Sequence, residues 1–181
     1  SDDLNGKKIM VQGVGHVGEY LVEYLSKEGA KIYISDIHQD TLSRITKEYG
    51  ATQVDLNHVY DLDMDIYAPC ALGGTLNNDT IDRLKCQIVA GAANNQLKDE
   101  DLHGKALLER GILYAPDFAV NAGGVINCFS EVEGLSSEWA LQKAQDIYHT
   151  IYDIVERSQN ENKPTHLIAM NMAEEKINAA H

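Results

Sequence analysis

Short apolar runs alternate with amphipathic stretches along the chain up to residue 115. The runs have the length and the β-branched and aromatic content of buried strands. We expect strands at residues 8–12, 31–36, 52–55, 65–70, 87–92 and 112–115. Between the runs, apolar residues recur at helical spacing, as in the first stretch at Val17, Leu21, Tyr24 and Leu25. This alternation predicts βαβ units, so the expected fold class is α/β, with a doubly wound, mostly parallel sheet and helices on both faces.

The pattern becomes purely helical after Asn121. An apolar stripe beginning at Val125 indicates one helix, and a long amphipathic helix capped by Ser136 or Ser137 follows it. Pro164 opens a last helix with its own apolar stripe. The sheet is therefore expected to carry additional C-terminal helices.

A glycine motif, GVGHVG at residues 13–18, joins the first predicted strand to the first predicted helix. In the G-x-G-x-x-G pattern, Gly13 permits the tight turn, Gly15 lets a pyrophosphate approach the backbone, and Gly18 lets the helix pack against the strand. The helix N-terminus adds free N–H groups and a partial positive charge. A plain glycine-rich turn is the alternative, but the full strand–turn–helix–strand context favours a dinucleotide site of the Rossmann type.

An acidic residue, Asp36, ends the second predicted strand. A carboxylate at this position accepts hydrogen bonds from the ribose hydroxyls of NAD and repels the 2′-phosphate of NADP. Residues 37–43 contain no arginine or lysine that would attract that phosphate, and Arg44 follows only after them. We therefore predict NAD rather than NADP, the alternative being that Asp36 only caps a turn.

Two asparagine-containing segments follow later strands. AGAANNQL at residues 90–97 places Asn94 and Asn95 after a buried strand, where an amide matches the carboxamide and ribose of a nicotinamide nucleotide. An Asx turn is the alternative there. NAGGVIN at residues 121–127 places Asn121 to cap a helix whose second and third residues are glycines, a floor with little bulk for a flat ring. An ordinary N-cap is the alternative for Asn121.

Composition narrows the possible partners. The 181 residues are 44% hydrophobic and carry a formal net charge of −13, as in a soluble globular protein. The negative charge argues against nucleic acid and anionic membranes as partners. An anionic cofactor must consequently be held locally, by backbone amides.

Cysteine and histidine positions indicate no metal site. Cys70, Cys86 and Cys128 are odd in number without metal-ligand spacing, and the histidines are scattered. Reduced thiols, the lack of a signal peptide and the lack of an apolar run of about 18 residues predict a cytoplasmic location. The chain starts at Ser1 without a methionine, which indicates a piece of a longer protein or a processed chain.

Four segments together, GVGHVG, DIYAPCALGG, AGAANNQL and APDFAVNAGGVIN, resemble the cofactor-binding domain of the Glu/Leu/Phe/Val dehydrogenase family. The resemblance extends from about residue 5 to residue 177 and is strongest to the leucine-type members. It implies a parent enzyme that oxidatively deaminates an L-amino acid to the 2-oxo acid and ammonia, with hydride transfer to NAD.

The resemblance also assigns roles to individual residues. The implied cofactor-binding residues are Gly13, Val14, Gly15, His16, Val17, Gly18, Asp36, Ile37, Cys70, Ala71, Asn94 and Asn121. Among them, the glycine motif would hold the pyrophosphate and Cys70 and Ala71 would line the groove. His16 replaces an asparagine common in the family, with little expected consequence because backbone groups contact the phosphates. Ile151 and Ile154 would contact the aliphatic tail of the substrate, and a plain core stripe is their alternative.

In that family the substrate domain precedes this segment and supplies a catalytic lysine and aspartate. We therefore expect residues 1–181 to be a single NAD-binding domain, with residues 136–181 as a helical extension and no catalytic residue of its own. The chain alone would bind NAD without catalysis. An L-amino acid would be a partner only together with the preceding domain, and the parent would be a homo-oligomer.

Two alternatives stay open. A stand-alone NAD(H)-sensing module would need the glycine motif but not the nicotinamide-side segments. A phenylalanine, valine or glutamate dehydrogenase of the same family would keep all the motifs. The apolar pair Ile151 and Ile154 argues against glutamate, whose side-chain carboxylate would require a buried cation.

Overall fold

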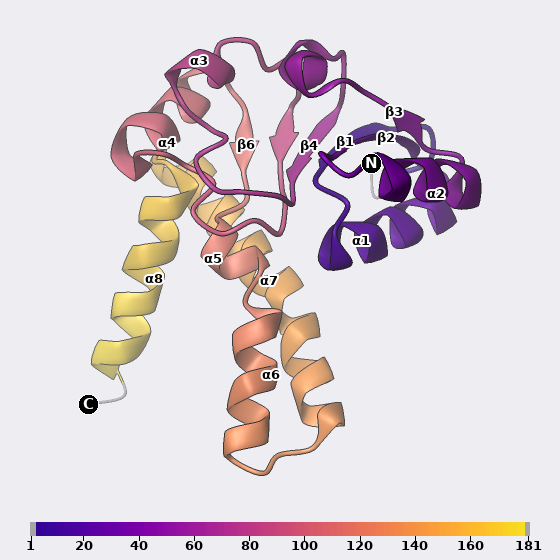
Figure 1. Cartoon of the computed structure of the whole chain (residues 1–181). Helices are drawn as coiled ribbons and strands as arrows, with labels where there is room; N and C mark the ends of the chain where they lie inside the picture. The colour runs from indigo at the N-terminus through magenta and orange to yellow at the C-terminus, as the bar shows by residue number, and fades with distance from the viewer. Residues whose placement is uncertain (1–2, 180–181) are drawn as a thin grey trace.

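The computed structural model describes residues 3–179 (Figure 1). Residues 1–2 and 180–181, the ends of the expected domain, lie outside the described residues. Within residues 3–179, six strands form one sheet in the order β3-β2-β1-β4-β5-β6, and every neighbouring pair is parallel. The strands are β1 (Lys8–Gln12), β2 (Lys31–Ser35), β3 (Thr52–Gln53), β4 (Ile66–Pro69), β5 (Ile88–Val89) and β6 (Leu113–Tyr114). The predicted Rossmann-type α/β fold is confirmed.

Helices cover both faces of the sheet. They are α1 (His16–Lys27), α2 (Gln39–Tyr49), the 3₁₀ helix η1 (Leu56–Asp61), α3 (Asn78–Ile81), α4 (Glu100–Glu109), α5 (Asp117–Val120), α6 (Gly123–Val132), α7 (Ser137–Glu161) and α8 (Thr165–Ala179). Figure 1 shows α1 and α2 on one face and α3 and α4 on the other. The chain reverses its winding direction between β1 and β4, which is where doubly wound sheets bind ligands.

Alternation along β1 separates the core into two clusters. Ile9 and Val11 pack with Val22 of α1 and Ile45 of α2, whereas Met10 joins the cluster beneath η1, α3 and α4. Successive strand residues point to opposite faces, so one short apolar run supplies both clusters. This two-sided burial explains why the strands have a continuous apolar pattern.

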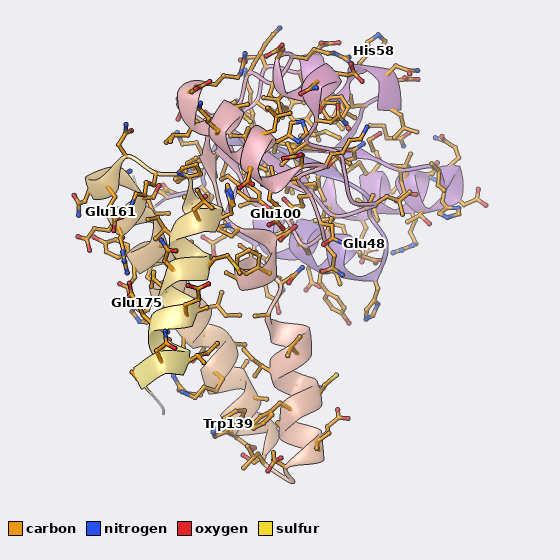
Figure 2. The ribbon with its side chains drawn as sticks, turned by 90° about the vertical axis from the view of Figure 1, so that its left-hand side faces the viewer. Glu48, His58, Glu100, Trp139, Glu161 and Glu175 are labelled. Carbon is orange, nitrogen blue, oxygen red and sulfur yellow. The ribbon has the colours of Figure 1, made fainter. Side chains whose placement is uncertain are left out.

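The last helices extend away from the sheet. Helices α6 and α7 form a hairpin, with Trp139 near the end farthest from the strands (Figures 1 and 2). Ser136 caps α7 by accepting a 3.2 Å hydrogen bond from the N–H of Trp139, as predicted. Helix α8 begins beside the sheet, where the hydroxyl of Thr165 donates a 2.6 Å hydrogen bond to the carbonyl of Tyr114, and runs away from it (Figure 1). This bond anchors α8 beside β6.

A buried histidine lies where α8 meets α4. His166 is 2% exposed, and a Cβ on Gly104 would lie 2.1 Å from its ring. Neither ring nitrogen has a hydrogen-bond partner among residues 3–179. Burial lowers the pKa of His166 below its usual value of 6.5, although the nearby carboxylates of Glu100 and Asp101 raise it. The neutral imidazole is thus the form that the fold accommodates.

Acidification should therefore weaken the folded state through His166. Because its pKa is lower in the folded than in the unfolded chain, its contribution is present above about pH 6.5 and is lost as the pH falls toward the folded pKa. Urea unfolding at pH 7.5 and pH 5 should show a smaller loss of stability on acidification in His166→Leu than in the wild type. An NMR titration giving His166 a pKa at or above 6.5 would contradict this expectation.

Candidate functional site

The carboxyl ends of the parallel strands lie at one edge of the sheet, and the predicted cofactor-binding residues lie in the segments that follow β1, β2, β4, β5 and β6. The loop after β4 follows the glycine motif closely, because the N–H of Cys70 donates a 2.7 Å hydrogen bond to the carbonyl of Gln12. A Cβ on Gly13 would lie 2.6 Å from the Cβ of Ala71. The structure thus brings Cys70 and Ala71 against the glycine motif. That they line a cofactor groove stays a prediction.

The three glycines of the motif differ in what requires them. Gly13 has a φ of +95°, a conformation that side chains disfavour. A Cβ on Gly18 would lie 2.1 Å from the carbonyl oxygen of Gly13, so the tight packing of α1 on β1 excludes one. At Gly15, in contrast, φ is −68°, and apart from the adjoining residues and helix backbone no atom lies within 4 Å of the position that a Cβ would occupy. The fold of the described residues therefore gives no reason for a glycine at residue 15.

Helix α1 presents an uncapped N-terminus at this edge. Gly15 is its N-cap residue, and no side chain caps it. The N–H groups of the first turn, at His16, Val17 and Gly18, lack acceptors within the helix and carry the positive end of the helix dipole. The His16 ring lies edge-on to Tyr20, with 5.2 Å between centroids. These N–H groups are suited to bind an anion, and the open position at Gly15 fits a diphosphate at that helix end.

Val14 connects the glycine motif to Asp36. Its side chain is 0% exposed, and its N–H donates a 2.8 Å hydrogen bond to Oδ2 of Asp36. This bond means that Val14 helps to orient Asp36. A contact of Val14 with the cofactor stays a prediction. The glycine motif and the end of β2 are joined by this bond.

Asp36 lies just beyond the end of β2. Its other oxygen, Oδ1, accepts a 2.9 Å hydrogen bond from the N–H of His38, so the predicted turn-capping alternative is present in the structure. Ile37 beside it is exposed. The first cation after Asp36 along the chain, Arg44, is held by two hydrogen bonds to Glu19 at 2.6 and 2.7 Å. Asp36 therefore adds negative charge to this rim, without Arg44 to balance it.

Cys70 behaves as a neutral thiol. Burial raises the pKa of the Cys70 thiol above its usual range, and the Cβ of Cys70 lies 3.5 Å from a Cβ position on Gly18. A buried, protonated thiol packs as a small apolar group. Cys70 is accordingly a packing residue beside the glycine motif and not a nucleophile.

Asn94 and Asn121 meet although they come from different motifs. The Nδ2 group of Asn121 donates a 2.5 Å hydrogen bond to Oδ1 of Asn94. Asn95, next to Asn94, has a φ of +51°, so the loop turns sharply there. The asparagine pair lies on the β5–β6 side of the switch point, where the chain leaves the sheet toward α6.

The predicted N-cap role of Asn121 is wrong. The structure inserts the short helix α5 before it, and Asn121 is the C-terminal cap of α5. Ala122 precedes α6 with helical backbone angles of −60° and −15°. Because α5 and α6 follow each other almost without a break, the side chain of Asn121 reaches Asn94 instead of capping α6.

The predicted substrate-contacting pair is part of the packing between α7 and α8. Ile154 is 2% exposed and forms a cluster with Ile168 and Ala169, against which Ile151 packs. For Ile154 the core alternative therefore describes the packing within residues 3–179. The contact of Ile151 and Ile154 with the substrate stays a prediction.

Two residues that sequence analysis passed over support the asparagine pair. Gln96 and Asp117 are buried polar residues, and the carboxylate of Asp117 accepts a hydrogen bond from the N–H of Gln96 at 2.7 Å. Both stand inside the quoted motifs, and a polar residue in a run of small apolar ones is the signal that could have identified them.

Metal-binding clusters and membrane-spanning helices are both missing from residues 3–179. No group of three or more histidine, cysteine, aspartate or glutamate side chains in this range could hold a metal ion. Within the same range, none of the helices has the length and apolar character needed to cross a membrane.

Comparison with known proteins identifies the family. The profile of Glutamate/Leucine/Phenylalanine/Valine dehydrogenase matches residues 1–181. Leucine dehydrogenase of Thermoactinomyces intermedius is 49% identical over 176 residues, which are 97% of this chain and 48% of that protein. Leucine dehydrogenase of Bacillus subtilis (strain 168) is 49% identical over 98% of this chain and 48% of its own length.

A solved structure agrees with this family assignment. The crystal structure of L-tryptophan dehydrogenase from Nostoc punctiforme superposes with a TM-score of 0.96 at 42% identity, covering 99% of this chain and 54% of that one. The chain thus spans about half the length of the curated relatives that it matches. Leucine dehydrogenases and their family are NAD-dependent oxidoreductases. On this sequence and structural similarity, the chain belongs to the Glutamate/Leucine/Phenylalanine/Valine dehydrogenase family.

Proposed function

We propose that this chain is the NAD-binding domain, residues 1–181, of an L-amino-acid dehydrogenase of the leucine type. The parent enzyme would oxidatively deaminate L-leucine or a similar branched-chain amino acid to the 2-oxo acid and ammonia. The observation that carries the proposal is the asparagine pair, Asn94 with Asn121, on the same sheet edge as the uncapped N-terminus of α1. A site that held only a phosphate would need the helix end but not the pair.

The cofactor-contacting groups divide along this edge. The first-turn N–H groups of α1 would hold the pyrophosphate, with Gly15 leaving room for it. Asp36 would accept hydrogen bonds from the adenosine ribose. Asn94 and Asn121 would hold the carboxamide of the nicotinamide ring. NAD, when bound, supplies the hydride acceptor.

The remaining parts of the activity are assigned to the parent protein. We infer from the family resemblance that a preceding domain supplies the catalytic lysine and aspartate, and that the L-amino acid binds between the two domains. On this proposal the chain by itself binds NAD but does not oxidise leucine. We further propose that the parent is a cytoplasmic homo-oligomer.

Coenzyme preference tests the proposal. In isothermal titration calorimetry the chain should bind NAD at least about tenfold more tightly than NADP, because the Asp36 carboxylate repels a 2′-phosphate and Arg44 is engaged by Glu19. The matched variant Asp36→Asn keeps the shape and removes the charge, so it should narrow the difference between the two coenzymes. Equal wild-type affinities would refute the role of Asp36, and absence of NAD binding would refute the proposed function.

A further inference from the structure

We propose that Asp117 and Gln96 are positioning residues for the nicotinamide end of the cofactor, an inference that rests on the proposed function. Each side chain holds backbone of the segments that present the asparagine pair. Three connections are involved: within the loop after β5, from that loop to α5, and from that loop to the loop after β4.

The first connection closes the loop after β5 on itself. Gln96 is fully buried, and its Nε2 group donates hydrogen bonds to the carbonyls of Gly91 at 2.7 Å and Ala93 at 3.0 Å. These two acceptors lie on the N-terminal side of Asn94 in the same loop. One side chain therefore binds the backbone just before Asn94, whereas its own backbone lies just after it, and the intervening turn has little freedom.

The second connection joins this loop to α5. Asp117 is 8% exposed, and its Oδ2 accepts the N–H of Gln96 at 2.7 Å while its Oδ1 accepts the N–H of Phe118 at 2.6 Å. Its backbone carbonyl accepts the N–H of Asn121 at 2.9 Å. A single residue thus contacts the segment carrying Asn94 through its carboxylate and the segment carrying Asn121 through its carbonyl.

The third connection joins the loop after β5 to the loop after β4. The N–H of Gly74 donates to the carbonyl of Asn95 at 2.7 Å, and the N–H of Leu76 donates to the carbonyl of Gln96 at 3.0 Å. A Cβ on Gly73 would lie 2.6 Å from the carbonyl oxygen of Asn94, so the two loops are in close contact. With one side of the loop held in this way, the Asp117 carboxylate holds the other.

The held geometry suits a primary carboxamide. The bond from Asn121 to Asn94 occupies Oδ1 of Asn94, and among residues 3–179 neither Nδ2 of Asn94 nor Oδ1 of Asn121 has a partner. These two groups are one donor and one acceptor, the complement of the acceptor and donor of the nicotinamide carboxamide. Recognition by such a pair depends on its placement within about 0.5 Å, which packing and supporting hydrogen bonds provide.

The experiment compares NADH with ADP-ribose, which lacks the nicotinamide ring. Calorimetric titration of Asp117→Ala should show NADH binding weakened about tenfold and ADP-ribose binding changed less than about twofold, as expected for loss of a hydrogen-bonded contact confined to one end of the ligand. Gln96→Leu should show the same pattern. The matched control Asp99→Ala removes another carboxylate that accepts a backbone N–H, that of Leu102 at the start of α4, and should leave both affinities within about twofold of wild type.

Other results would contradict either the positioning role or the proposed function. Unchanged NADH binding in a folded Asp117→Ala chain, or equal weakening of NADH and ADP-ribose, would overturn the positioning role while leaving the proposed function in place. Absence of NADH binding by the wild-type chain would instead remove the proposed function itself. If circular dichroism shows Asp117→Ala unfolded, Gln96→Leu decides the matter by the same comparison of ligands, with selective loss of NADH affinity required.

Discussion

Replacement of Gly18 by alanine should destabilise the chain by about 3 kcal/mol, the upper part of the range for overpacking a well-packed interior. The reason is local: the added methyl group would lie 2.1 Å from the carbonyl oxygen of Gly13, which is backbone and cannot rotate away. Helix α1 would have to move off β1. Urea unfolding followed by circular dichroism should show a lower midpoint than in the wild type.

Gly124→Ala is the matched control for this prediction. Gly124 is also a helical glycine, in α6, but no atom lies within 4 Å of its Cβ position. The substitution should therefore be neutral or stabilise the chain by up to about 1 kcal/mol, the difference in helix propensity between glycine and alanine. A Gly18→Ala chain as stable as the Gly124→Ala chain would show that α1 is not packed on β1 as described.

Replacement of Gly15 by alanine should affect cofactor binding rather than stability. We expect the affinity for NAD to fall about tenfold to a hundredfold while the fold is retained. The Cβ position at Gly15 is open and its φ is ordinary, so stability should change by less than about 1 kcal/mol, the cost of alanine at an N-cap. The lost affinity would come from a methyl group placed where the pyrophosphate approaches the N-terminus of α1.

Calorimetric titration with NAD, together with urea unfolding of the same preparation, checks this prediction. Wild-type affinity in Gly15→Ala would mean that the diphosphate does not approach residue 15, and the assignment of the glycine motif to the cofactor would then fail. A large loss of stability would mean that residue 15 has a structural role that the described contacts do not show. Comparison with Gly18→Ala separates the two kinds of glycine within one motif.

The first helix shows how far hydrophobic spacing could be trusted. Spacing predicted a buried face containing Val17 and Tyr24, yet both are exposed, and Gly18, Val22 and Leu25 are the residues that α1 buries. The buried face of α1 is the one that packs Gly18 against Gly13. Because glycine has no apolar side chain, a prediction from apolar spacing leaves Gly18 out and assigns the wrong face of α1 to the core.

Short irregular segments were the other part of the fold that the hydrophobic pattern did not predict. Helix α5 and the 3₁₀ helix η1 have too few residues for a hydrophobic period, and neither was predicted. Missing α5 led directly to the incorrect cap at Asn121. The strands, in contrast, were predicted to within a few residues, because all of them except β3 are parts of local apolar runs bounded by glycine or polar residues.

The amino-acid sequence by itself determined the α/β alternation, the strand-to-helix position of the glycine motif and the acidic residue after β2. Each depends on neighbours in the chain, whose order the sequence states directly. Only the tertiary structure decided that Asn94 meets Asn121, that Asp117 links their two segments, and that Ile154 lies inside a helix–helix contact. These depend on how distant segments pack, and hydrogen-bond partners far apart in the chain leave no periodic pattern from which they could be predicted.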